Sequence, residues 1–75
     1  PAHNTTRLTI KTNGRADVQM KMFDLLGKEV RNLYNGELAN GAFNMDIDLT
    51  GLETGIYVIR ATVNDQLLTQ RLVVD

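Results

Sequence analysis

DLTGLETGIYVIRATV, residues 48–63, is the stretch that decides the fold of this chain. Gly51 and Gly55 mark a corner that leads into a strand. After Gly55, β-branched and aromatic residues occupy positions of both parities, and a strand that is apolar on both faces is typical of the middle of a sheet. The spacing Leu52-x-x-Gly55-x-Tyr57 also predicts a tyrosine corner, in which the Tyr57 hydroxyl bonds back to the upstream backbone and fixes a Greek-key crossover.

Ahead of this stretch, short alternating patterns are separated by turn signals. Residues 17–24 alternate between apolar and polar side chains, which predicts a strand with one buried and one exposed face. Residues 24–28 should then turn, with Asp24 at the start and Gly27 at a positive φ. A helix over residues 20–33 is disfavoured because Gly27 would lie at its centre and the apolar spacing is two.

The remaining elements follow from the same signals. Asn35-Gly36 is expected to form a turn, followed by a polar connection over residues 36–41. Asn64 and Asp65 are expected to accept positive φ in a tight hairpin. Further strands are expected at residues 8–12, 29–34, 43–49 and 67–74, with residues 1–4 as a lead-in. The chain is therefore predicted to be all-β, a single antiparallel immunoglobulin-like β-sandwich of about six to seven strands over residues 1–75.

The composition limits the chain to one small domain and disfavours several partners. A chain of 75 residues has a thin core, because it buries only about 60% of its unfolded surface. Eight basic and nine acidic residues give a formal net charge of −1. A chain with this charge has no positive electrostatic field that would attract nucleic acid or an anionic membrane. The chain has no cysteine for a disulfide or zinc–thiolate site, and no apolar run approaches the ~20 residues of a membrane span. It begins at Pro1 without a leader, so we expect a domain excised from a larger protein.

The sequence offers few groups for catalysis or metal binding. His3 has no acid or nucleophile near it in sequence and is expected to be a solvated terminal residue, so no catalytic residue is predicted. Asp46 and Asp48 share one strand face and offer hard oxygen ligands, but two carboxylates fall well short of the six to eight oxygens that calcium takes. No metal or other cofactor is expected.

The aromatic residues raise the alternative of a sugar-binding surface. Phe43 and Tyr57 are expected in the core and at the corner, which leaves Phe23 and Tyr34 as rings that could form an exposed platform. Phe23 is expected instead to cover the edge of the core.

Two segments, taken in order, carry a family resemblance. These are Asp24-x-x-Gly27-Lys28-x-Val30 and Leu52-x-x-Gly55-x-Tyr57, and they stand between Pro1-Ala2 and Arg71-Leu72-Val73-Val74. The chain resembles, over essentially its whole length, the type A C-terminal sorting domain of the Bacteroidetes type IX secretion system, also called the Por secretion system. It departs from the family where only Pro1-Ala2 stands for the usual Pro-Asn-Pro, and where Arg71 replaces the usual Lys.

The resemblance implies that the chain is a removable sorting signal on a secreted protein. Family members follow a covalently linked cargo domain that crosses to the periplasm by an N-terminal signal peptide and folds there. The outer-membrane translocon and its shuttle proteins then recognise the sorting domain, and a sortase-like peptidase commonly removes it. The cargo remains on the outer cell surface or is released. The family fold is a seven-stranded immunoglobulin-like sandwich, in agreement with the pattern above.

The last strand is the expected recognition element. It ends almost flush with the chain end, and an edge strand can be captured by pairing or read through its side chains. The residues expected to carry recognition are Thr69, Arg71, Leu72, Val73 and Val74. In a purely structural reading, Leu72 and Val74 only complete the core. Open sheet edges also allow two copies to pair as a homodimer.

Two other functions remain open from the sequence. The immunoglobulin-like domain of the flagellar hook cap scaffold shares the Asp-x-x-Gly-x-x-Val turn and a late Gly-x-Tyr strand, which suggests a structural module of a surface assembly. A carbohydrate-binding appendage of a glycosidase is the third reading.

Overall fold

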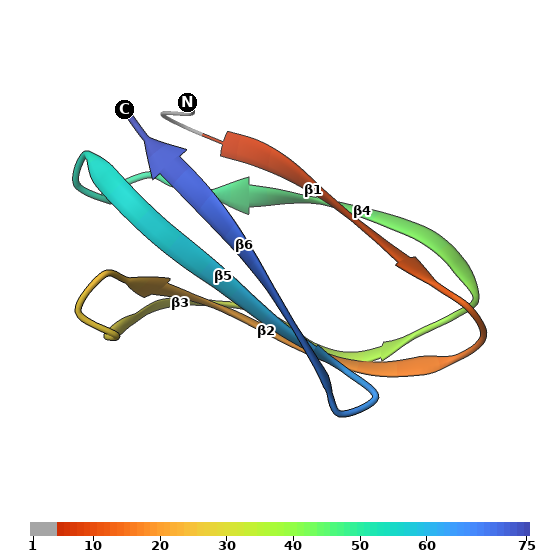
Figure 1. Cartoon of the computed structure of the whole chain (residues 1–75). Coiled ribbons are helices and arrows are strands. Elements are labelled where there is room, and N and C mark those ends of the chain that lie inside the picture. Colours follow the sequence, from red (N-terminus) through yellow and green to blue (C-terminus); the bar gives the residue numbers. More distant parts are fainter. Residues whose placement is uncertain (1–4) are drawn as a thin grey trace.

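A computed structural model describes residues 5–75 of the chain, so the expected lead-in over residues 1–4 lies outside the described part. Every regular element between residues 5 and 75 is a strand, as Figure 1 shows. The strands are β1 (Thr5–Thr12), β2 (Ala16–Asp24), β3 (Glu29–Leu38), β4 (Gly41–Asp48), β5 (Gly55–Val63) and β6 (Gln66–Val74). The prediction of an all-β chain without a helix over residues 20–33 is confirmed. No helix long and apolar enough to cross a membrane occurs in the described part.

The strands form two antiparallel sheets. One sheet consists of β1 and β4, and the other has the order β3-β2-β5-β6. The chain passes from one sheet to the other at β1–β2, β3–β4 and β4–β5, so that the two sheets face each other in Figure 1. β5 lies between β2 and β6, which confirms that its two-sided apolar pattern marks an interior strand.

The core lies between the two sheets and is built on the strict alternation of β2. Met20 and Met22 are completely buried, and Val18 is 3% exposed. The polar positions between them face away from the core. The buried apolar residues are Ile10, Ala16, Val18, Met20, Met22, Leu38, Ile47, Leu49, Tyr57, Ile59, Ala61 and Val74. This set uses inward positions from all six strands and the β4–β5 corner, as expected for a small domain in which few side chains can be spared.

The predicted tyrosine corner is present at the start of β5. The Tyr57 hydroxyl donates a hydrogen bond of 2.6 Å to the backbone oxygen of Glu53, four residues upstream. The Leu52 N–H donates to the Leu49 oxygen at 3.1 Å, and Gly51 has a φ of 86°, a left-handed conformation that favours glycine. These contacts fix the path by which the chain leaves β4 and enters the other sheet.

Two predicted turns are also confirmed. Gly27 has a φ of 86°, and the Asp24 carboxylate accepts hydrogen bonds of 2.9 Å from the N–H groups of Leu26 and Lys28. In the β5–β6 hairpin, Asn64 and Asp65 have φ values of 47° and 70°. In the β2–β3 turn the Asp24 carboxylate thus acts together with two backbone hydrogen bonds, from the Gly27 N–H to the Asp24 oxygen and from the Asp24 N–H to the Lys28 oxygen, which explains why an aspartate opens this segment.

The prediction for residues 35–41 is wrong. Asn35 and Gly36 lie inside β3, paired with Gln19 and Val18 of β2, and the chain turns only between β3 and β4. Hydrogen bonding along β2 therefore overrides the local turn preference of Asn-Gly. The Tyr34 ring covers Gly36, since a Cβ built there would lie 3.4 Å from the Tyr34 oxygen. An aromatic ring over a glycine compensates for the missing side chain in a strand.

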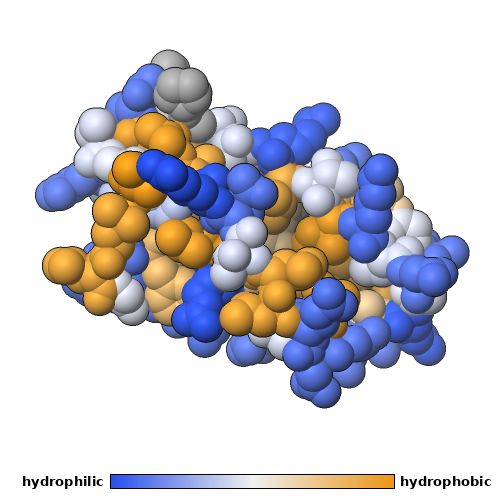
Figure 2. Space-filling view, in the orientation of Figure 1, coloured by the Kyte–Doolittle hydropathy of each residue, from blue (hydrophilic) through white to orange (hydrophobic). Residues whose placement is uncertain are grey.

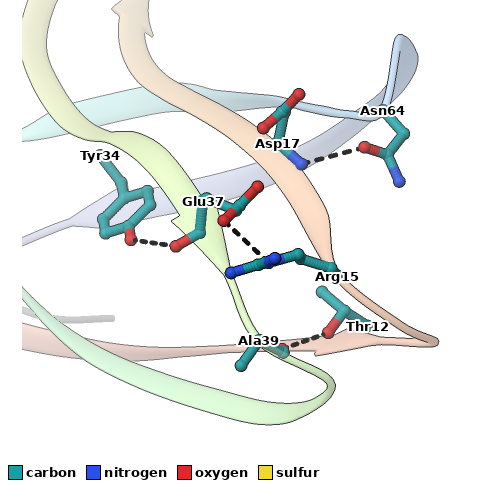
Figure 3. A network of polar contacts seen from close by, with 7 residues as sticks. All are labelled: Thr12, Arg15, Asp17, Tyr34, Glu37, Ala39 and Asn64. Carbon is teal, nitrogen blue, oxygen red and sulfur yellow. Dashed lines mark hydrogen bonds and ion pairs between the residues drawn. The ribbon is translucent and has the colours of Figure 1, made fainter.

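Polar contacts hold this end of β3 to its neighbours (Figure 3). The Tyr34 hydroxyl donates to the backbone oxygen of Glu37 at 3.2 Å, and the Glu37 carboxylate pairs with Arg15 at 2.9 Å. Thr12 donates to the Ala39 oxygen at 2.8 Å, which ties the end of β1 to the β3–β4 connection. These contacts keep residues 35–38 extended.

Candidate recognition surface

Among residues 5–75, the strand β6 lies at the edge of the four-stranded sheet and pairs with β5 alone. The register places Leu72 opposite Tyr57 and Val74 opposite Gly55, both on the core side. Val74 is 1% exposed and Leu72 is half-buried against the core. These two residues complete the core, as in the purely structural reading of the last strand.

The other three predicted residues face away from the core. Thr69, Arg71 and Val73 alternate with Leu72 and Val74 along β6, and all three are exposed. Val73 is an exposed apolar residue with 42% of its surface accessible. The structure therefore divides the predicted recognition residues between the two faces of one strand.

The outward residues of β6 continue into rows that cross the sheet. Arg71 lies opposite Val58, which lies opposite Phe23, and Thr69 lies opposite Arg60, which lies opposite Lys21. Directly opposed residues on one face of an antiparallel pair are close enough to interact. We call this surface the outer face of the four-stranded sheet. Its central residues are Lys21, Phe23, Ile56, Val58, Arg60, Thr69, Arg71 and Val73.

Two contacts order the side chains at the centre of the outer face. The Arg60 guanidinium carbon lies 5.5 Å from the centre of the Phe23 ring, a cation–π distance. The Lys21 ammonium pairs with the Glu29 carboxylate at 3.3 Å. Lys21 and Arg60 are not predictable from the sequence as site residues, because only the pairing register shows that they are neighbours.

The two aromatic rings considered for a sugar platform lie on opposite faces. Tyr34 faces the core side opposite Met20, and its ring centre is 5.4 Å from that of Phe43. Phe23 lies on the outer face beneath Arg60. The expectation that Phe23 covers the edge of the core is wrong, because its position in β2 has the opposite parity to the buried Met22.

The carboxylates of Asp46 and Asp48, considered above as calcium ligands, already bind neighbouring protein groups. The Asp46 carboxylate pairs with Arg7 at 3.2 Å, and that of Asp48 accepts a hydrogen bond of 2.9 Å from the Thr50 N–H. Across residues 5–75, no group of three or more His, Cys, Asp or Glu residues is arranged to hold a metal ion. His3 lies outside the described residues.

Asp48 is expected to make the stability of the domain depend on pH at acidic pH. Hydrogen bonds from the Thr50 side chain and N–H, with the positive charge of Arg31, hold the pKa of the Asp48 carboxyl below its ordinary 3.8. Because the folded state has the lower pKa, ionised Asp48 stabilises the fold above pH 3.8, and this contribution is lost as the pH falls through the folded pKa.

Asp48→Asn removes this titration and keeps an oxygen for the Thr50 N–H. We expect the parent to exceed the variant in free energy of unfolding by a constant amount above about pH 5, and this difference to shrink as the pH falls below about 4. Urea denaturation at a series of pH values measures it. A difference that is unchanged between about pH 6 and pH 2 would refute this role.

The structure is that of a small all-β domain, with β6 at the edge of its four-stranded sheet within the described residues. A family model of the secretion system C-terminal sorting domain matches residues 1–75, the whole chain, and the chain belongs to this family. The chain is thus a C-terminal sorting signal for type IX secretion. No curated protein and no solved structure matches it significantly.

Membership of the family defines the setting of the domain. Its partners are the type IX secretion machinery and a cargo region that precedes it in the chain. The protein that carries it is secreted or displayed on the cell surface. Sorting domains of this family are in general non-catalytic, and the hook-cap and carbohydrate-binding alternatives are not favoured.

Proposed function

We propose that residues 1–75 act as a single sorting domain whose last strand, β6, is recognised by the translocon and its shuttle proteins. Thr69, Arg71 and Val73 make the contact, while Leu72 and Val74 hold the strand in place from the core side. The observation that carries this proposal lies at the C-terminal end of β6, where Arg71 and Val73 are exposed, Leu72 is half-buried and Val74 is buried. The earlier residues of the strand, 66–70, are exposed on both faces. The domain itself contributes no catalysis.

The open edge of β6 supplies a second means of recognition. A strand at a sheet edge presents backbone N–H and C=O groups that a partner strand can pair with, and side chains on one face then supply specificity. Through this edge, two copies of the domain can also form a homodimer, and such pairing would compete with the translocon for the same backbone groups.

The proposed route places recognition after folding. In this route the cargo and the domain fold in the periplasm, and recognition follows because the outward residues of β6 share one face only once β6 has paired with β5. Passage through the outer membrane follows, and a sortase-like peptidase then separates the domain from its cargo.

The proposal is tested by changing the two rows of β6 separately. A cargo fused to the domain is expressed in a type IX secretor, and the exported fraction is measured. Arg71→Glu is expected to reduce export at least about tenfold with an unchanged melting temperature, since it reverses an exposed charge. Leu72→Ala is the matched neighbour and is expected to lower the melting temperature while the folded fraction is still exported.

Removing residues 72–75 is expected to abolish export, but it also takes Val74 from the core. That deletion is informative only if circular dichroism shows that the shortened domain still folds. Normal export of a folded Arg71→Glu, Val73→Asp variant would contradict recognition through the outward side chains of β6.

A further inference from the structure

The outer face carries a shallow hollow beside the proposed recognition strand. Its volume is about 120 Å³, and it is lined by Gln19, Lys21, Phe23, Arg60, Thr62 and Leu67. All six residues come from outward positions of β2, β5 and the start of β6. The hollow therefore combines two cations, an amide and a hydroxyl with an aromatic and an aliphatic wall.

The polar groups of the hollow suit a carboxylate. Arg60 and Lys21 offer charged N–H donors from directly opposed positions, and Thr62 offers a hydroxyl donor one outward position further along β5. Hydrogen bonds between guanidinium or ammonium groups and carboxylates are among the strongest in proteins. Phe23 already orients the Arg60 guanidinium, so less side-chain freedom is lost when an anion binds.

The charge around the hollow is incompletely balanced. Among residues 5–75, Lys21 pairs with Glu29, whereas Arg60 and Arg71 make no ion pair within 4.0 Å. Ile56, Val58 and Val73 surround these cations, and Val58 lies between Phe23 and Arg71 in one row. Figure 2 shows hydrophobic and hydrophilic residues interspersed over the visible side of the molecule. A partner for this face needs negative charge and apolar side chains together.

We propose that the outer face binds an acidic, apolar segment of a partner protein, with one carboxylate seated between Lys21 and Arg60. A second carboxylate pairs with Arg71, and apolar side chains of the segment cover Val58 and Val73. This inference rests on the proposed recognition of β6 and names the chemistry of the partner that reads it.

The other end of the same face sets the orientation of the segment. Asp17 and Glu37 are opposed there, and Asp65 lies beside them around a second, larger hollow. Glu37 is paired with Arg15, but among residues 5–75 Asp17 and Asp65 make no ion pair within 4.0 Å and repel an acidic partner, so the segment is confined to the basic half of the face. A protein segment that alternates acidic and apolar residues satisfies both the charges and the apolar row, whereas an anionic glycolipid headgroup satisfies only the charges.

The binding test uses the chain of 75 residues and a synthetic peptide in which glutamate and valine alternate. Backbone NMR shifts are followed during titration. We expect the largest shifts at Lys21, Phe23, Arg60 and Thr62, with affinity falling as salt increases. A peptide of alternating lysine and valine should not bind. Shifts centred on the exposed Leu25 and Leu26 would instead overturn the proposal, as would tighter binding of anionic lipopolysaccharide micelles at the same residues.

Two charge-reversed variants with the same change in net charge distinguish binding at this surface from a general effect of net charge. Lys21→Glu, Arg60→Glu is expected to weaken peptide binding at least about tenfold. Arg7→Glu, Lys11→Glu makes the same charge change on β1 of the other sheet, where Arg7 pairs with Asp46 and, among residues 5–75, Lys11 makes no ion pair within 4.0 Å. This variant should change binding less than about twofold. If reversal at Lys21 disturbs folding, the neutral Lys21→Gln, Arg60→Gln variant replaces it. Equal losses in both reversed variants would refute the site.

Export then distinguishes the failure of this inference from the failure of the proposed function. If Arg71→Glu blocks export but the folded Lys21→Glu, Arg60→Glu variant is exported normally, the machinery recognises β6 without an acidic segment at the hollow. In that case only this inference fails. If neither variant affects export, both this inference and the proposed function fail. Loss of export in both variants, with normal export of Arg7→Glu, Lys11→Glu, is the expected result.

Discussion

Replacing Tyr57 with alanine is expected to lower the free energy of unfolding by about 3–5 kcal/mol, the usual cost of deleting a buried aromatic ring. Tyr57 is 7% exposed and faces the core from the interior strand β5. The total stability of a domain of this size is on the order of 4–11 kcal/mol, so the loss is a large fraction of it. Urea denaturation followed by circular dichroism measures the change.

Tyr57→Phe isolates the hydrogen bond of the corner. The ring stays in place and only the 2.6 Å bond to the Glu53 oxygen is lost, so we expect a loss of about 0.5–1.5 kcal/mol. Equal stabilities of the Tyr57→Ala variant and the parent would show that the corner does not hold the two sheets together.

Met20→Ala is expected to cost about 2–5 kcal/mol, because it opens a cavity at the centre of the core. The Met20 side chain is completely buried on β2, which pairs with both β3 and β5. The surrounding side chains come from both sheets, so they cannot close the cavity without moving one sheet against the other. The midpoint of urea unfolding should therefore fall steeply.

Gln19→Ala is the matched control for Met20→Ala. Gln19 is the preceding residue of the same strand, it faces outward, and its substitution carries a similar loss of strand preference without a cavity. We expect it to change the free energy of unfolding by less than about 1 kcal/mol. A Gln19→Ala effect as large as that of Met20→Ala would place the core elsewhere.

Much of the fold is predictable from the sequence because small β domains depend on alternation. The alternation of residues 17–24 predicts a strand with one buried face, on which the structure places Met20 and Met22, and the Leu52-x-x-Gly55-x-Tyr57 spacing located the corner at Tyr57. Both signals are local, because side-chain parity and turn conformation are set within a few residues. The immunoglobulin-like Greek-key assignment stays a prediction.

The errors arose where distant pairing outweighs local preference. Asn35-Gly36 has the composition of a turn, but the pairing of Gly36 with Val18 and the cover of Tyr34 keep it in β3. Only the folded pairing determines this outcome, since an Asn-Gly dipeptide also fits an extended strand when a partner strand is available.

The recognition surface was only partly predictable for the same reason. The resemblance and the terminal position pointed to β6, including Arg71. Neither could show that Arg60 and Lys21 stand beside it, because residues 21, 60 and 71 are brought onto one face only by the order β2-β5-β6. Nor did the sequence decide between recognition and packing for Val74, which the structure buries.

The most direct test of the sorting function is a secretion assay with a transplanted domain. Residues 1–75 are fused to the C-terminus of a fluorescent protein that carries a signal peptide, and the fusion is expressed in a type IX secretor and in a strain lacking the outer-membrane translocon. We expect fluorescence in the medium or on the cell surface only when the translocon is present, and periplasmic fluorescence otherwise. Retention of a folded fusion in the competent strain, or equal export by both strains, would contradict the sorting function.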